Sequence, residues 1–171
     1  YGTWLREAAY ERGLGFVDMW SPLNNITVQE RKTEPTFTLI KDAVHPGPDG
    51  QVVMAVAMID DMDLQPLVSN VTLSRNAKGT WDAKGQRAEV SDLTETEDGL
   101  TFTVVEESLP WVLPADAQLG ARLTRLGHRF SRESLQISGL APGPYTLTID
   151  GTEVGTFGSN QLGSHIELQA N

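Results

Sequence analysis

The chain contains 171 residues, of which 39% are hydrophobic and 21% charged, a composition typical of a folded globular protein rather than a disordered one. Asp and Glu number 23 against 13 Lys and Arg, and this net charge of −10, with no Lys/Arg cluster, excludes a conventional nucleic-acid-binding surface. The absence of Cys excludes disulfides, thiolate metal sites and a cysteine nucleophile, and it leaves the cellular compartment open.

The first part of the chain predicts a helix followed by a buried strand. Residues 3–12 place their apolar side chains on one face, and Gly13 is a typical helix stop. Residues 15–20 (GFVDMW) form a nearly continuous apolar run, as in a strand buried on both faces of a parallel sheet. This succession favours an α/β layer fold. Since the N-terminus is neither an initiator Met nor a signal peptide, we expect the chain to be part of a longer protein.

A long connection and a second helix follow. Residues 21–41 are polar, contain two prolines and are expected to form a loop, with a short strand as one interpretation of residues 36–40. A helix is predicted over residues 49–62, because its apolar residues recur at i, i+3, i+4 and i+7. No apolar run in the chain approaches the ~20 residues of a transmembrane helix, so we expect no membrane partner.

Beyond residue 66 the hydrophobic pattern changes to alternation with a period of two, which is typical of half-buried strands. The alternating segments are 71–73, 100–104 and 145–149. The dipeptide Asp150-Gly151 predicts a hairpin turn directly after the last of them. We therefore divide the chain into residues 1–66, which belong to an α/β domain, and residues 67–171, a mostly β accessory region.

The motif with the clearest chemical meaning is Asp42-x-x-His45, in a loop rich in Pro and Gly directly before the second helix. A hydroxyl nucleophile needs a base, which a His supplies, and a carboxylate can hold that imidazole in the required tautomer. Pro46 and Pro48 restrict the loop and lower the entropy cost of this geometry. The alternative is a structural role, since a lone D-x-x-H is common by chance and such a His can simply form a hydrogen bond within its loop.

Two further acidic features each allow a structural interpretation as well as a functional one. Asp18 lies inside the apolar run and needs hydrogen-bonding partners there, whether or not it serves a site. Asp60-Asp61-x-Asp63 contains ligands that suit calcium but lacks the Gly and terminal Glu of an EF-hand loop, which favours a solvated helix end.

Residues 42–51 (DAVHPGPDGQ), followed by the apolar helix, resemble the last sequence block of the SGNH (GDSL-type) hydrolases. The run at residues 16–20 is similar to the buried strand before that block. More loosely, residues 135–140, 143–151 and 162–168 resemble the β-rich tails of long bacterial members. The resemblance implies that residues 1–66 are the C-terminal part of a three-layer domain with a flavodoxin-like parallel sheet. It also implies a serine esterase that needs no cofactor and no metal.

By this resemblance His45 is the general base and Asp42 orients it, while the substrate is a small-molecule or carbohydrate ester, with acetylated carbohydrate as one class. The Gly-Asp-Ser nucleophile block and the Gly and Asn of the oxyanion hole are absent from the 171 residues. The expected partner is therefore the missing N-terminal part of the same domain. Without it, the chain should be inactive and should expose apolar surface around Phe16, Val17, Val53 and Val56.

Two other functions stay open at this stage. The β-rich region could make the chain a non-catalytic module that binds a carbohydrate or a protein partner, with Asp42 and His45 as relics. Alternatively, Asp42 and His45 could be ligands of a metal-dependent hydrolase, although the further His or Asp ligands that such sites need are not evident.

Overall fold

The structure is a computed structural model that describes residues 1–170. The chain forms two compact units, one of residues 1–65 with 112–126, the other of residues 66–111 with 127 onward. The chain thus returns to the first unit at residues 112–126, inside the segment that the sequence pattern assigns to the β-rich region. The functional division into a hydrolase part and an accessory region stays a prediction. No helix among the described residues is long and apolar enough to span a membrane.

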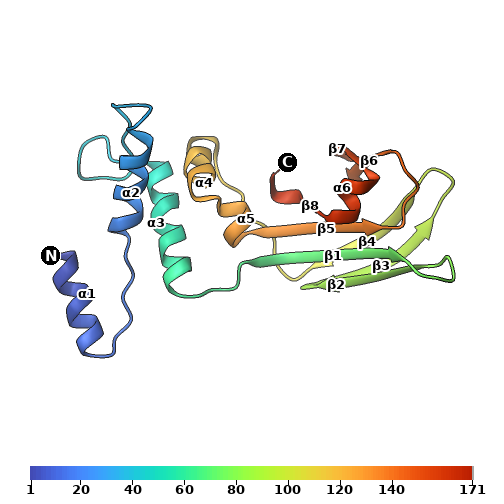
Figure 1. Ribbon diagram of the computed structural model, residues 1–171, viewed down its shortest axis with the longest axis horizontal. Helices are drawn as coiled ribbons and strands as arrows, with labels where there is room; N and C mark the ends of the chain where they lie inside the picture. The colour runs from blue at the N-terminus through green and yellow to red at the C-terminus, as the bar shows by residue number, and fades with distance from the viewer. Residues whose placement is uncertain (171) are drawn as a thin grey trace. The chain divides into compact units, whose positions relative to one another are not determined.

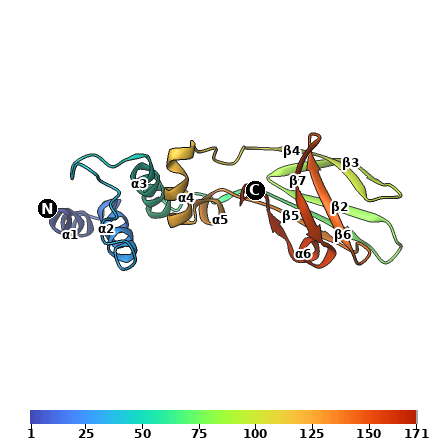
Figure 2. The same cartoon turned by 90° about the horizontal axis from the view of Figure 1, so that it is seen from above.

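The first unit is helical (Figure 1). Its helices are α1 (Gly2–Glu11), α2 (Trp20–Glu30), α3 (Pro48–Asp61), the short 3-10 helix η1 (Ala115–Ala117) and α4 (Gln118–Thr124). The first and third of these confirm the two helices that the apolar periodicity predicts. Figures 1 and 2 both show α3 and α4 side by side.

The core of the first unit gathers around α3. Val53 is fully buried against Leu23 of α2 and against Phe37 and Leu39 of the connection between the two helices. Leu119 and Leu123 of α4 pack on the same cluster, partly buried. The expectation that Val53 and Val56 are exposed is therefore wrong, because α2, the connection and α4 together cover this face of α3.

Three sequence predictions in this unit are also wrong. Residues 15–18 carry no regular secondary structure, because a strand of a parallel sheet needs neighbours and none among the described residues pairs with it. The expected loop over residues 21–41 contains most of α2, since Pro22 lies in the first helical turn, where a missing N–H is harmless. Residues 36–40 form no strand and instead follow a turn in which the N–H of Phe37 donates to the carbonyl of Glu34.

The second unit is mostly β, with short helices at its end. Its strands are β1 (Leu67–Arg75), β2 (Trp81–Gln86), β3 (Ala88–Glu95), β4 (Leu100–Glu106), β5 (Arg132–Ser138), β6 (Pro144–Ile149), β7 (Thr152–Gly158) and β8 (Ile166–Glu167). Its remaining elements are α6 (Ser159–Ser164) and η2 (Leu168–Ala170). Helix α5 (Leu126–Phe130) begins at the last residue of the first unit, and its other residues belong to the second.

The main sheet of this unit has the order β2-β1-β5-β8 and is mixed. Strands β1 and β5 pair in parallel, whereas the pairs β1–β2 and β5–β8 are antiparallel. The hairpins β3–β4 and β6–β7 are separate two-stranded sheets, and the second turns at Asp150-Gly151, as predicted. Leu73 is fully buried in a cluster with Val71, Leu135 and Ile137, onto which both hairpins pack. Helices and a mixed sheet make the chain α/β in the broad sense.

Candidate active site

The loop that carries Asp42 and His45 is anchored at both ends by buried or hydrogen-bonded residues. Leu39, which precedes it, is buried in the core of the first unit, and its carbonyl accepts the N–H of Gly47 at 3.0 Å. Pro48 then starts α3 at the first helical position, where proline is favoured. The carbonyl of Ile40 accepts the N–H of Ala43 at 3.2 Å, which closes a tight turn at Asp42.

Ala43 has a φ of 63°, in the left-handed region, which is uncommon for a residue with a side chain. This conformation accompanies two hydrogen bonds to one oxygen of Asp42. Oδ1 accepts the backbone N–H of Val44 at 3.0 Å and the backbone N–H of His45 at 2.7 Å. The backbone N–H groups of Val44 and His45 thus fix the position of the Asp42 carboxylate.

The second carboxylate oxygen reaches the imidazole. Asp42 Oδ2 lies 2.7 Å from His45 Nδ1, and we refer to this pair as the Asp42–His45 dyad. The bond favours the tautomer with the proton on Nδ1, which leaves the lone pair on Nε2. The side chains of His45 and Asp42 are 81% and 57% exposed, and Nε2 makes no hydrogen bond to any residue that the structure describes. The dyad therefore presents an accessible base.

The hydrogen bonds around Asp42 stabilise its charged form. They lower the pKa of Asp42 from 3.8 to about 2, with the backbone N–H of His45 as the largest cause, followed by the His45 side chain and the N–H of Val44. The carboxylate consequently stays ionised across the pH range in which an imidazole acts as a base, as an orienting carboxylate requires.

Gly50 sets the distance between this loop and α3. A Cβ at this position would lie 2.9 Å from the carbonyl oxygen of Leu39 and 2.9 Å from Cβ of Pro46, the residue directly after His45. Only a glycine allows the first turn of α3 to approach the loop so closely. Sequence reasoning does not single out this residue, because the crowding depends on how the loop folds back on the helix.

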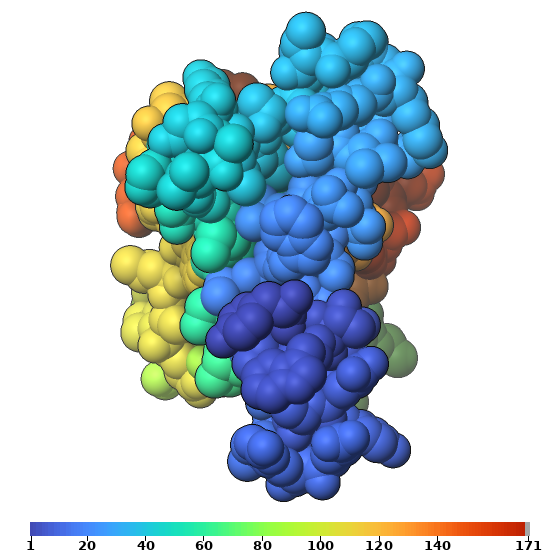
Figure 3. Space-filling view, turned by 90° about the vertical axis from the view of Figure 1, so that its left-hand side faces the viewer, coloured from blue at the N-terminus to red at the C-terminus, as the bar shows by residue number. Residues whose placement is uncertain are grey.

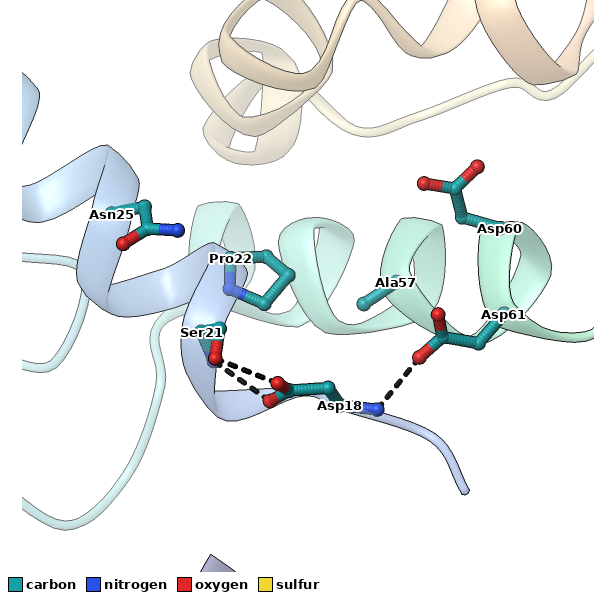
Figure 4. A pocket seen from close by; sticks show the side chains of 7 residues that line it. All are labelled: Asp18, Ser21, Pro22, Asn25, Ala57, Asp60 and Asp61. Atoms are coloured by element: carbon teal, nitrogen blue, oxygen red, sulfur yellow. Dashed lines mark hydrogen bonds between the residues drawn. The ribbon is translucent and has the colours of Figure 1, made fainter. Parts of the chain in front are cut away.

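Asp18 takes part in hydrogen bonds with Ser21 and Asp61 (Figure 4). Its carboxylate accepts the hydroxyl of Ser21 at 2.6 Å and the backbone N–H of Ser21 at 2.9 Å, and these bonds lower its pKa. Asp61 accepts the backbone N–H of Asp18 at 2.7 Å. The three residues border a cavity of about 180 Å³. Asp18 thus holds the start of α2 against the end of α3.

The remaining polar candidates do not form a metal site. Among residues 1–170 there is no group of three or more His, Asp or Glu side chains that could hold a metal ion. His128 Nδ1 lies 2.5 Å from Glu167 Oε1, a pairing that the sequence does not reveal because 39 residues separate the two. His165 contacts the carbonyl of Ser164 at 3.1 Å and lines a wide, shallow hollow beside α6 and β8.

Comparison with known proteins gives one structural similarity. No family model matches the chain, and neither does any curated protein. Among solved structures, the chain is similar to BT4096, described as a gut microbial diltiazem-metabolizing enzyme, with 26% sequence identity and a TM-score of 0.84. The similarity covers 99% of this chain and 40% of that chain, so this chain spans less than half the length of that enzyme.

Proposed function

We propose that the chain is the C-terminal part of an SGNH-type serine ester hydrolase and that the Asp42–His45 dyad supplies its general base. The observation that carries the proposal is the 2.7 Å contact between Asp42 Oδ2 and His45 Nδ1, with Nε2 open to a reacting group. The similarity to a drug-metabolizing enzyme over nearly the whole chain supports an enzymatic role.

In the proposed reaction a serine outside this chain attacks the carbonyl carbon of an ester. His45 Nε2 takes the hydroxyl proton, and Asp42 stabilises the imidazolium through Nδ1–H without taking the proton itself. His45 then returns the proton to the leaving alcohol, and an acyl-enzyme remains. A water molecule, deprotonated by the same Nε2, attacks the acyl carbon; the bond to the serine oxygen breaks, His45 returns the proton to that oxygen, and the acid is released.

The missing serine implies a partner surface on the first unit. Helix α1 buries none of its residues, and Tyr1, Trp4 and Trp20 expose more than half of their surface. Figure 3 shows the dark blue atoms of α1 open on the face turned toward the viewer. Phe16 and Val17, which lie in no strand and are half-buried, follow along the chain. In the proposal, the N-terminal part of the same domain covers α1 and pairs its sheet with residues 15–17.

The proposed substrates are carboxylic esters. Diltiazem carries an acetate ester, among other groups that an enzyme can attack, which makes it a useful probe beside acetylated carbohydrates. Because the dyad is exposed, a substrate can reach His45 at the surface of this unit. In the proposal, the pockets for the acyl and alcohol groups are formed by residues outside this chain.

The proposal is tested by joining this chain to the sequence encoded directly upstream and measuring hydrolysis of p-nitrophenyl acetate and diltiazem. His45→Ala should reduce kcat by a factor on the order of 10³ or more, and Asp42→Asn by a factor of a similar order, because the wrong tautomer is then favoured. His165→Ala is the matched control, since it removes an exposed imidazole from the second unit. If His45→Ala and His165→Ala hydrolyse the esters at equal rates, the assignment is wrong.

A further inference from the structure

Helix α4 contacts the first turn of α3, four residues after His45. The backbone N–H of Gly120 donates to Oδ1 of Asp49 at 2.8 Å, although the two residues are 71 positions apart. The first N–H groups of a helix have no partner within the helix, and Ala117, which precedes α4, offers no side-chain acceptor. Asp49 supplies that acceptor from another helix, with a negative charge where the helix dipole favours one.

The contact is also sterically tight. A Cβ at position 120 would lie 2.4 Å from the carbonyl oxygen of Asp49 and 2.9 Å from its Cα. Gly120 is buried, and its own carbonyl accepts the hydroxyl of the buried Thr124 at 2.8 Å. Leu119 and Leu123 pack into the core that also holds Leu39. Helix α4 is therefore fixed to α3 by backbone contact, which leaves no room for adjustment.

The same turn of α3 contacts the loop that carries the dyad. Gly50, next to Asp49, lies against Leu39 and Pro46, and Gly47 donates to the carbonyl of Leu39. Two prolines, Pro46 and Pro48, make the link from His45 to Asp49 stiff. A displacement of the first turn of α3 should therefore move His45 by nearly the same distance. Because the dyad itself is exposed, these contacts at the base of the loop are what fix its direction.

We propose that Asp49 and Gly120 are positioning residues for the Asp42–His45 dyad, and that residues 112–126 return from the β-rich region to hold the general base in place. The role of His45 as a base rests on the proposed function, whereas the mechanical link between α4 and the loop does not. One consequence is that a chain cut after residue 66 should keep the D-x-x-H motif but lose the orientation of its imidazole.

The test uses the ¹⁵N-labelled 171-residue chain. Imidazole ¹⁵N shifts at pH 8 report the His45 tautomer, and hydrogen exchange of the His45 amide reports its bond to Asp42. Gly120→Ala should convert the Nδ1–H tautomer to a mixture and raise that exchange rate by about tenfold, as expected for losing a hydrogen bond to a charged group. Asp49→Ala, which removes the acceptor without adding atoms, should act in the same direction.

Two variants serve as controls. Asp49→Asn keeps an oxygen acceptor for Gly120 and should leave the His45 signals as in the unsubstituted chain. Gly163→Ala makes the same chemical change in α6, where the new Cβ meets only the carbonyl oxygen of Ile137 at 3.9 Å.

The proposal is overturned if Gly120→Ala or Asp49→Ala folds and leaves the tautomer and exchange rate of His45 unchanged. Should Gly120→Ala fail to fold, Asp49→Ala decides alone. None of these measurements uses ester hydrolysis. An altered His45 signal together with an inactive full-length protein would therefore refute the esterase while supporting the positioning role.

Discussion

The close approach of Gly50 to the loop of the dyad makes Gly50→Ala a quantitative test of the site geometry. The added Cβ would lie 2.9 Å from the carbonyl oxygen of Leu39 and from Cβ of Pro46, so both must move by roughly 0.5 Å to reach ordinary contact distances. Overpacking of this kind costs about 1–3 kcal/mol. Replacing a helical Gly by Ala returns about 1 kcal/mol. The net expectation is a loss of about 0–2 kcal/mol, with a displaced Pro46.

Hydrogen exchange of the α3 amides measures this loss in the first unit alone, and the ¹⁵N shifts of His45 report the displacement. Gly47→Ala is the matched control, since Gly47 has a φ of −67° that Ala adopts freely and its Cβ would meet only the carbonyl oxygen of Leu39 at 4.0 Å. If Gly50→Ala stabilises α3 by the full helix-propensity gain and leaves His45 unchanged, the loop is not constrained as described.

Two further predictions concern ionisation. In His45→Ala the backbone donors to Asp42 remain, so the pKa of Asp42, measured by carboxyl ¹³C shifts, should stay below 3.8; a full return to 3.8 would contradict the assigned causes. In the unsubstituted chain, these hydrogen bonds should stabilise the fold above pH 3.8, and this stabilisation should be lost as the pH falls through about 2. Burial, followed by the charge of Glu106, raises the pKa of Glu133 above 4.5, which penalises the ionised form in the folded state. Glu133→Gln should therefore raise the urea midpoint of the second unit at pH 7 and lose this advantage below pH 4.5, and equal midpoints at pH 7 would count against it.

Local pattern accounts for much of the fold. Helix α3 follows from its apolar periodicity and from the proline at its start, and the β6–β7 hairpin follows from Asp150-Gly151. The spacing in D-x-x-H likewise predicts that Asp42 and His45 can meet, and the structure brings them together. In each case the determining contacts span only a few residues, which is the range that a sequence pattern encodes.

Features that depend on distant partners could not be predicted in the same way. The apolar run at residues 15–20 indicates a strand, but a strand exists only where another strand pairs with it. The sequence pattern does not predict helix α2, because Pro22 and the polar residues of this segment are typical of a loop, although Leu23 and Ile26 are spaced for one helix face. The contact of Asp49 with Gly120 depends on the chain returning after 71 residues, for which no local signal exists.

The dyad and its orientation thus have different physical origins. The contact between Asp42 and His45 is built from bonds that span two or three residues, so it persists in a chain without a nucleophile. The direction of the imidazole instead depends on Gly50 and Gly120, which act through the first turn of α3. In a hydrolase, a misplacement of about 1 Å can cost a factor on the order of 10² in rate. Substitutions at these glycines should therefore lower kcat by loosening the contact within the dyad, whereas Asp42→Asn breaks that contact directly.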